Sequence, residues 1–197
     1  MISHRSPSSP FALPSWAVCR LQSQKNPITT DQARMGFVIE LAAANVEEGT
    51  GGPFGAAVFE RRTGQLVAIG VNLVESTRCS HAHAEMAALA NAQRTLGNFN
   101  LGADSLPQHE LVTSCEPCAM CYGAIPWSGV RRVVCGARAS DAEAIGFDEG
   151  AKPKQWVGEL HKRGISVVRD LCRQEAVAVL QHYKATGGAI YGTSRMR

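Results

Sequence analysis

The sequence predicts an α/β fold in which a mixed sheet of five strands is covered by helices on both faces. Segments rich in Val, Ile and Ala alternate along the chain with segments whose apolar residues recur at helical spacing. Such alternation is typical of a sheet packed between helices. The 197 residues, 45% of them hydrophobic, can bury one sizeable core but not two. We therefore expect a single domain.

The first half of the chain predicts a helix followed by a hairpin. Residues 31–47 are expected to form the helix, because Thr29 followed by Gln32 is a plausible capping box and apolar residues then recur at helical spacing. Two segments rich in β-formers, residues 54–60 and 65–73, follow a glycine-rich turn and are separated by a short Gly-containing loop. They predict an antiparallel hairpin.

The second half predicts helices and strands in alternation. An alanine-rich helix is expected at residues 83–96, where Gly97 ends it. The later elements are short and are bounded by Gly, Pro or polar residues. Strands are expected at residues 110–114, 131–135 and 165–168, and helices at residues 118–125, 153–163 and 172–184.

The most informative pattern is His83-Ala84-Glu85, followed some thirty residues later by Pro117-Cys118-Ala119-Met120-Cys121. It supplies three zinc ligands, His83, Cys118 and Cys121, and one acid that need not bind the metal. Catalytic zinc sites use three protein ligands and keep the fourth position for water or substrate, whereas structural sites are closed by four. Pro117 suits the first helical position, and the positive end of the helix favours thiolates. The pattern favours a reaction centre.

Less specific interpretations of these residues exist. A Cys-x-x-Cys pair alone is also found in redox centres and in structural zinc sites, and Cys115 beside it could make a chance cluster. Cys79 and His81 are further possible ligands. The combination with His83-Ala84-Glu85 favours the catalytic interpretation.

His-x-Glu with Pro-Cys-x-x-Cys resembles the signature of the zinc-dependent cytidine and deoxycytidylate deaminase superfamily. The resemblance implies a three-layer α/β/α fold and one Zn²⁺ per subunit, and it selects His83 as the ligand because the family places that ligand two residues before the acid. It also implies hydrolytic deamination. Zinc lowers the pKa of its bound water toward about 7, Glu85 takes the proton, and hydroxide attacks a carbon that bears an amino group.

Three further stretches look like the bacterial guanine deaminase branch of this superfamily: residues 51–56, 114–125 and 146–149. The tRNA adenosine deaminases share the zinc signature but usually carry a small-residue loop where this chain has Gly-Phe-Asp-Glu. The resemblance therefore implies an enzyme that converts guanine to xanthine and ammonia in purine metabolism.

The same resemblance assigns roles around the metal. Glu149 corresponds to a second carboxylate, more often aspartate in the relatives, that helps move protons to the leaving amino group; a solvated loop acid is the alternative. Asn72 and the backbone N–H of Ala84 are expected to bind the purine. Phe54, Trp127 and the His83 ring are expected to form walls against the flat base, and core packing is the alternative for the aromatic walls. Tyr191, in the C-terminal tail, is expected to help close the pocket.

Three other functions remain open at this stage. A tRNA adenosine deaminase would need a basic groove and would bind RNA in a salt-dependent way. A cytosine or other nucleobase deaminase would differ in pocket shape alone. A zinc-binding interaction module without turnover would close the fourth metal position with Cys79, His81 or Cys115.

Composition narrows the partners and the compartment. Twenty basic and seventeen acidic side chains give a formal charge of +3, which neither demands nor excludes a polyanion. The resemblance implies a small nucleobase as the partner and does not imply nucleic acid. No apolar run is long enough to span a membrane. Seven cysteines without a secretory leader favour the cytoplasm. A homodimer is implied by the resemblance.

The chain divides into a Ser- and Pro-rich N-terminal extension (residues 1–28), a deaminase domain (residues 29–185) and a C-terminal tail (residues 186–197) that could close the site. The extension is expected to be a loosely ordered arm or an over-long start. The alternative is a docked arm with Phe11 and Trp16 buried.

Overall fold

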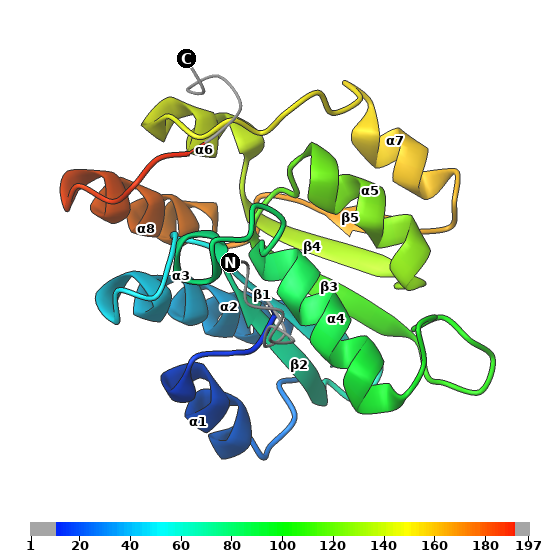
Figure 1. Cartoon of the computed structure of the whole chain (residues 1–197). Helices are drawn as coiled ribbons and strands as arrows, with labels where there is room; N and C mark the ends of the chain where they lie inside the picture. The colour runs from blue at the N-terminus through cyan, green and yellow to red at the C-terminus, as the bar shows by residue number, and fades with distance from the viewer. Residues whose placement is uncertain (1–10, 192–197) are drawn as a thin grey trace, which may run out of the picture.

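The computed structural model of the protein describes residues 11–191 (Figure 1). Its centre is a five-stranded sheet with the strand order β2-β1-β3-β4-β5. The β1 strand pairs antiparallel with β2 and β3, and the pairs β3/β4 and β4/β5 are parallel. The strands are β1 (Gly55–Glu60), β2 (Leu66–Val71), β3 (His109–Cys115), β4 (Arg132–Ala137) and β5 (Ser166–Val168). The expected mixed sheet of five strands is confirmed.

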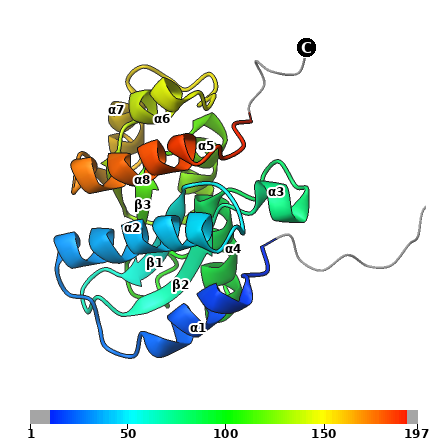
Figure 2. The ribbon, with the colours of Figure 1, turned by 90° about the vertical axis from the view of Figure 1, so that its left-hand side faces the viewer.

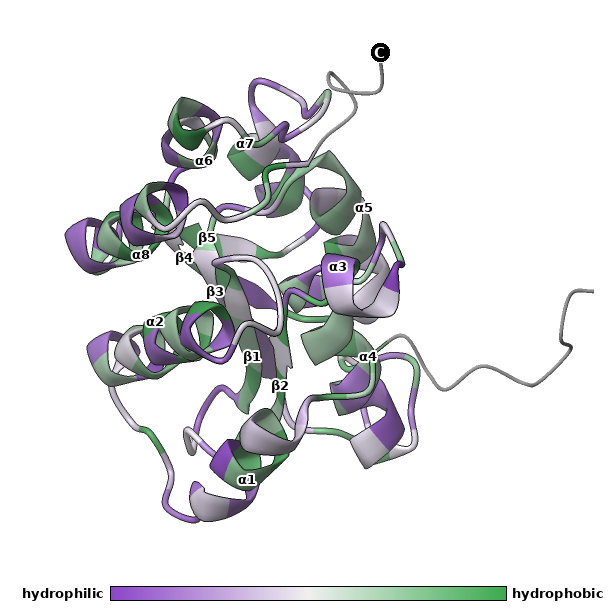
Figure 3. Cartoon of the chain, turned by 60° about the vertical axis from the view of Figure 1, so that its left-hand side comes forward, coloured by the Kyte–Doolittle hydropathy of each residue, from purple (hydrophilic) through white to green (hydrophobic). Residues whose placement is uncertain are grey.

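Helices cover both faces of the sheet, so the expected three layers are confirmed (Figures 1 and 3). On one face α2 packs against β1 and β3, and α8 packs against β4 (Figure 2). On the other face α4 packs against β1 and β2, α5 contacts α4, and α7 lies beside β5. These helices are α2 (Asp31–Glu47), α4 (Ala84–Leu96), α5 (Ala119–Ser128), α7 (Trp156–His161) and α8 (Arg173–Ala185).

The alternation of side chains along β1 divides the interior into two cores. Ala57 and Phe59 belong to the core under α2 and α8, whereas Ala56 and Val58 belong to the core under α4 and α5. Because both faces of the strand are buried, its sequence is apolar throughout, as expected for a central strand. Both ligand-bearing helices, α4 and α5, lie on the same side of the sheet.

Three helices were not predicted: α1 (Ser15–Ser23), α3 (Val74–Thr77) and α6 (Ala139–Ile145). The expectation of a loosely ordered arm is wrong for α1, which is docked on the core, although Phe11 and Trp16 are only partly buried. Residues 1–10 of the extension lie outside the described residues. Trp16 donates a hydrogen bond from its indole N–H to Thr50 Oγ1 at 3.0 Å, and Ala17 is fully buried. Pro14 is the N-cap residue of α1 and directly precedes its first residue, Ser15.

The described part of the N-terminal extension also lies against the sheet edge. β2 is an edge strand, and α1 packs against it. Asn91 on α4 donates from Nδ2 to the carbonyls of both Phe11 and Ile69, at 3.2 and 3.4 Å. The segment therefore helps to cover an edge that would otherwise expose backbone groups. No helix within residues 11–191 has the length and apolar character needed to cross a membrane.

Candidate active site

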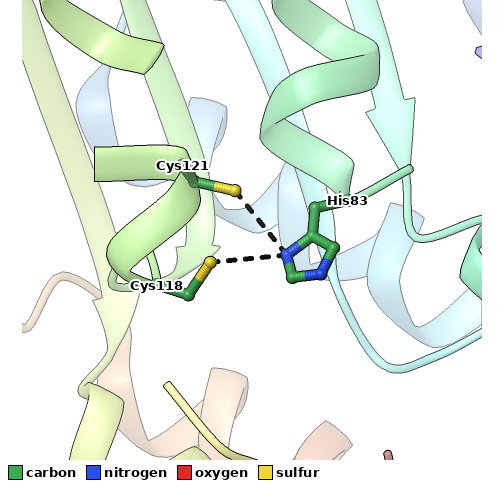
Figure 4. A group of neighbouring side chains, drawn as sticks. All are labelled: His83, Cys118 and Cys121. Atoms are coloured by element: carbon green, nitrogen blue, oxygen red, sulfur yellow. Dashed lines mark hydrogen bonds between the residues drawn. The ribbon is translucent and has the colours of Figure 1, made fainter. Parts of the chain in front are cut away.

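Two helix N-termini bring the three predicted metal ligands together (Figure 4). His83 is the N-cap residue of α4, and Cys118 is the N-cap residue of α5. Cys121 lies in the first turn of α5, on the same side as Cys118. The Nδ1 atom of His83 lies 3.5 Å from Cys118 Sγ and 3.6 Å from Cys121 Sγ.

These spacings fit a tetrahedral zinc ion. With Zn–S of about 2.3 Å and Zn–N of about 2.0 Å, tetrahedral angles require about 3.5 Å between a sulfur and a nitrogen ligand. The observed 3.5 and 3.6 Å agree with that requirement. Within the described residues, the one group of His, Cys, Asp or Glu side chains close enough to hold a metal consists of His83, Cys118 and Cys121. The set leaves a fourth coordination position for water or substrate.

Close packing of α4 on the sheet sets the position of His83. Gly70 of β2 lies under the first turn of α4, where a Cβ atom would stand 2.1 Å from the carbonyl oxygen of Ala84 and 2.3 Å from the amide nitrogen of Ala88. Only glycine allows this approach. We expected Pro117 at the first helical position, and this was wrong. Cys118 is the N-cap residue of α5, and Pro117 precedes it.

Glu85 lies in the first turn of α4 and is 6% exposed. Burial, together with the negative charge of the neighbouring Cys118, raises the pKa of this carboxyl to about 7. A hydrogen bond from Cys121 lowers the pKa of Cys118 to about 4. The helix N-termini and the paired thiols therefore favour a thiolate at Cys118.

A cavity of ≈700 Å³ opens beside the metal ligands. Its size is in the range of small-molecule sites. Two of the ligands, His83 and Cys118, line it together with Glu85 and Glu149. One wall is aromatic: the Phe147 ring makes edge-to-face contacts with Phe54 and Tyr191, at centroid distances of 5.0 and 5.4 Å.

Glu149 lies in the loop that follows α6, and the fold brings it into the cavity. The residue is 8% exposed, and its backbone carbonyl accepts a hydrogen bond from the N–H of Ala119 at 2.8 Å. Burial raises the pKa of Glu149 to about 8, and the negative charges of Cys118 and Glu85 contribute. The structure thus places two buried carboxyls beside one metal site.

Asn72 follows β2 and also lines the cavity, with 1% of the residue exposed. Its Oδ1 accepts the N–H of Val74 at 3.3 Å, and its carbonyl accepts a hydrogen bond from Asn45 Nδ2 at 2.8 Å. A Cβ on Gly51 would stand 1.9 Å from that carbonyl oxygen, so glycine is required for the turn to pack here. Hydrogen bonds therefore fix both the side-chain oxygen and the backbone carbonyl of Asn72.

The other predicted substrate-binding residues differ in position. Tyr191 lines the cavity, and its buried hydroxyl has no hydrogen-bond partner within residues 11–191. Ala84 is fully buried and does not line the cavity. It is the first residue of α4, so its backbone N–H is one of the donors that have no acceptor within the helix.

Trp127 is the clear correction. Its side chain is 86% exposed and does not line the cavity. It lies near the C-terminal end of α5, whereas the N-terminal end of α5 carries the ligands. Six residues beyond Cys121, at about 100° per residue, a side chain points to a different side of the helix.

The residues that could have closed the metal site lie outside the ligand group. Cys115 is buried and lines the cavity, while the Cys79 thiol lies 3.2 Å from His81 Nδ1. None of the three belongs to the group that could hold the metal within the described residues. The arrangement therefore does not support a closed structural zinc site.

Phe147 is a cavity residue that sequence reasoning missed. It is 6% exposed, contacts both Phe54 and Tyr191, and stacks on Tyr183 with centroids 6.1 Å apart. A signal was present, because Phe147 stands two residues before Glu149 in a segment already taken as functional.

Comparisons with known proteins agree with this geometry. Residues 28–137 match the family model for the cytidine and deoxycytidylate deaminase zinc-binding region. A guanine deaminase from Bacillus subtilis (strain 168) is 40% identical over 111 residues, which are 56% of this chain and 67% of that protein.

Solved structures extend the likeness over most of the chain. The structure of a guanine deaminase from Nitrosomonas europaea is 49% identical, with a TM-score of 0.87, and the match covers 93% of this chain and 100% of that one. A structure of NE0047 in complex with 2,6-diaminopurine is 51% identical, with a TM-score of 0.87, over 93% of this chain and 96% of that one.

The tRNA deaminases are more distant. A tRNA-specific adenosine deaminase from Buchnera aphidicola subsp. Schizaphis graminum (strain Sg) is 31% identical over 132 residues, which are 66% of this chain and 79% of that protein. With the ligand geometry and the matched region together, this chain belongs to the cytidine and deoxycytidylate deaminase zinc-binding family and is more similar to its guanine deaminases than to its tRNA adenosine deaminases.

Proposed function

We propose that this protein is a zinc-dependent guanine deaminase that hydrolyses guanine to xanthine and ammonia. The observation that carries the proposal is the pair of buried carboxyls, Glu85 and Glu149, lining one cavity with the metal ligands. The family match alone does not choose the substrate, because a zinc site is shared by deaminases of different specificity. Glu149 lies beyond the matched region, in the segment that distinguishes the guanine branch.

One zinc ion per subunit would be held by His83, Cys118 and Cys121, whose spacing suits a tetrahedral ion. When bound, zinc supplies a Lewis acid that makes water acidic near neutral pH. The remaining chemistry depends on where the chain holds protons. Both carboxyls are buried, and a buried carboxyl can hold a proton near neutral pH.

Glu85 is the proposed proton carrier for the attack of water on C2 of guanine. It is two residues from His83 and lines the cavity, so it can take a proton from the attacking water and deliver it to a ring nitrogen. Its burial keeps competing bulk water away from the transfer.

Glu149 is the proposed carrier for the departing amino group. An amide anion is too basic to leave, so the nitrogen must be protonated before the C–N bond breaks. Glu149 lines the same cavity from a different loop, which allows it to act on the amino nitrogen while Glu85 acts on the ring. Two carboxyls can thus divide the proton transfers.

Guanine recognition is assigned to Asn72 and the aromatic wall. Guanine presents the acceptors O6 and N7 on one edge. Because Asn72 Oδ1 is occupied by the N–H of Val74, its Nδ2 group is the part that suits these acceptors. Phe54 and Tyr191 would pack against the flat base, and the N–H of Ala84 would supply a further donor.

The proposal also includes a homodimer in the cytoplasm. The helix α5 contains no charged residue, yet Trp127 on it is 86% exposed and nearby Phe99 is 84% exposed. The loop that follows Phe99 is joined to the last residue of α5 by a hydrogen bond from the Leu101 N–H to the Ser128 carbonyl at 2.8 Å. An exposed apolar surface of this kind supports a protein interface, and a second copy is the occupant we propose.

The cytoplasmic location is proposed from the cysteines. A reducing compartment would preserve the Cys118 and Cys121 thiols.

Ammonia release by the purified, zinc-loaded protein tests the proposed reaction. The substrates are guanine, cytosine, cytidine, adenine and adenosine, together with an adenosine-containing tRNA anticodon stem-loop. We expect turnover of guanine alone, and a loss of about 10²- to 10⁴-fold in kcat for Glu85→Gln. Glu143→Gln, an exposed substitution on α6, is the matched control and should leave turnover unchanged.

Each contrary result has a distinct meaning. Turnover of the stem-loop without turnover of guanine would replace guanine by adenosine in tRNA as the substrate. If no substrate releases ammonia although the protein binds one zinc ion per chain, the result would favour a zinc-binding module without turnover. Equal activity of Glu85→Gln and the wild type would remove Glu85 from the reaction.

A further inference from the structure

The loop between α6 and α7 carries a buried lysine as well as Glu149. Lys152 follows Glu149 by three residues, and its side chain is only 10% exposed. The loop bends sharply at Gly150, which has a φ of +70°. Its turn is fixed locally by two hydrogen bonds, from the Gly150 N–H to Asp148 Oδ1 at 2.8 Å and from the Lys152 N–H to the Gly150 carbonyl at 3.0 Å.

The ammonium group of Lys152 contacts three different groups. Its Nζ donates a hydrogen bond to the Pro117 carbonyl at 2.7 Å, and it lies 3.9 Å from Glu116 Oε2. It also lies 4.7 Å from the centroid of the Trp156 ring, in a cation–π contact. A lysine is rarely buried unless its charge is paired in this way.

Glu116, the partner of Lys152, is itself held from other directions. Arg169 donates from Nε to Glu116 Oε1 at 2.5 Å, and the N–H of Ala139 donates to Oε2 at 3.2 Å. The Glu116 side chain is 4% exposed. The contacts of Lys152 therefore join a fixed network, so they can restrain the loop that carries Glu149.

Together the contacts hold both neighbours of the metal ligand Cys118. The carbonyl of Pro117, on one side, accepts from Lys152, and the N–H of Ala119, on the other side, donates to the Glu149 carbonyl at 2.8 Å. The residues on either side of Cys118 are thus attached to one short loop. Any shift of that loop would change the distance between the Glu149 carboxyl and the metal site.

We propose that Lys152 is a positioning residue that fixes Glu149 relative to the metal ligand Cys118. It does not touch the reacting atoms in this assignment; it acts through the loop it anchors. The inference rests on the proposed function, because it explains how the second proton carrier is placed. A displacement of about 1 Å in a catalytic group can lower a rate by about 10²-fold, so such an anchor has measurable consequences.

The kinetic test compares Lys152→Met with the conservative Lys152→Arg and with Lys154→Met, an exposed lysine in the same loop. Lys152→Met should lower kcat on guanine by about 10- to 100-fold with KM changed less than about threefold. Lys152→Arg keeps a donor and a cation and should recover most of the rate. Lys154→Met should match the wild type.

A double-mutant cycle separates positioning from a general structural role. In the Glu149→Gln background, Lys152→Met should lower kcat by less than about twofold, because the carrier it positions is already disabled. Additive losses, or an unchanged kcat in the single variant, would overturn the proposal. If Lys152→Met does not fold, Lys152→Gln removes the charge and carries the same test.

Hydrogen exchange gives a readout that does not need guanine turnover. With zinc bound, the Ala119 amide should exchange about 10-fold faster in Lys152→Met than in the wild type and Lys154→Met, because its acceptor belongs to the released loop. If the wild type does not deaminate guanine but this exchange still rises, the proposed function fails while the anchor stands. Unchanged exchange at Ala119 would overturn the anchor itself.

Discussion

Glu149 is the side chain on which the proposed preference for guanine over the substrates of related deaminases depends most. Its carboxyl lies in a cavity beside the metal ligands at 8% exposure, yet it comes from a loop far along the chain from them. A glutamate is one methylene longer than an aspartate, so its carboxyl can reach into the cavity while the loop backbone stays farther from the substrate.

We predict that Glu149→Gln lowers kcat on guanine by about 10²-fold, because the amide cannot carry a proton to the leaving nitrogen. Zinc content and KM should change little, since Glu149 is not among the ligands. Steady-state kinetics with metal analysis checks both statements. Glu143→Gln, an exposed substitution on α6, serves as the control. Wild-type turnover by Glu149→Gln would show that Glu149 is a solvated loop acid without a part in the reaction.

At this scale the three expected ligands lie together, and the aromatic wall was predicted in part. The spacing of His83, Cys118 and Cys121 reflects two helix N-termini, and the family resemblance selected His83 over His81. Of the expected aromatic residues, Phe54 and Tyr191 line the cavity. An aromatic residue carries no such constraint. Trp127 and Phe147 have similar chemistry in a sequence, and only the direction of the chain decides that Phe147 reaches the cavity while Trp127 does not.

At the scale of elements, α4 must approach β2 closely to present His83 and Glu85. Gly70 makes this possible, because a side chain there would meet the backbone of Ala84 and Ala88. The obstacle would be helix backbone, which cannot rotate away as a side chain can. The first turn of α4 would have to move instead.

We predict that Gly70→Ala displaces that turn and weakens zinc binding, with kcat reduced by about 10-fold or more. Competition with a chromogenic chelator measures the metal affinity. Gly36→Ala on α2, where a Cβ would meet nothing within 4 Å, is the matched control. Wild-type zinc affinity and turnover in Gly70→Ala would show that α4 accommodates the added methyl group without moving His83.

The element predictions succeeded where periodicity was long. The helix at residues 31–47 was predicted with its observed bounds, because several turns of apolar spacing mark it. The expected capping box was wrong by one residue, since Thr30 and not Thr29 is the N-cap residue and accepts the N–H of Ala33. The helices α1, α3 and α6 were missed, since their nine, four and seven residues are too short for a clear period. The stability of α1 comes from packing against β2, which no local pattern contains.

At the scale of the whole molecule, one helix has a composition that a monomer does not explain. The α5 segment is apolar around its whole circumference, and helices of that kind are normally buried on all sides. Its inner side contacts α4 and carries Cys121, but Trp127, Gly123 and Met120 lie on its exposed side. Phe99 extends the exposed apolar surface beyond the helix.

We predict that the protein sediments with twice its chain mass of 21.1 kDa and that Trp127→Asp and Phe99→Asp shift it toward the monomer. Burying a carboxylate in an apolar interface without a partner is strongly unfavourable, so either substitution should weaken the association. Gln181→Asp, which adds the same charge on the exposed side of α8, is the control and should remain dimeric. Analytical ultracentrifugation over a range of concentrations gives the result directly.

The location of this surface links association to the active site. Met120 lines the cavity and also lies on the exposed side of α5, so a second copy docked there would contact the rim of the pocket. If that is the interface, the monomeric variants should show a higher KM for guanine with zinc still bound, because part of the rim is lost. A monomeric wild type, or dimers that persist in both aspartate variants, would exclude this surface as the interface.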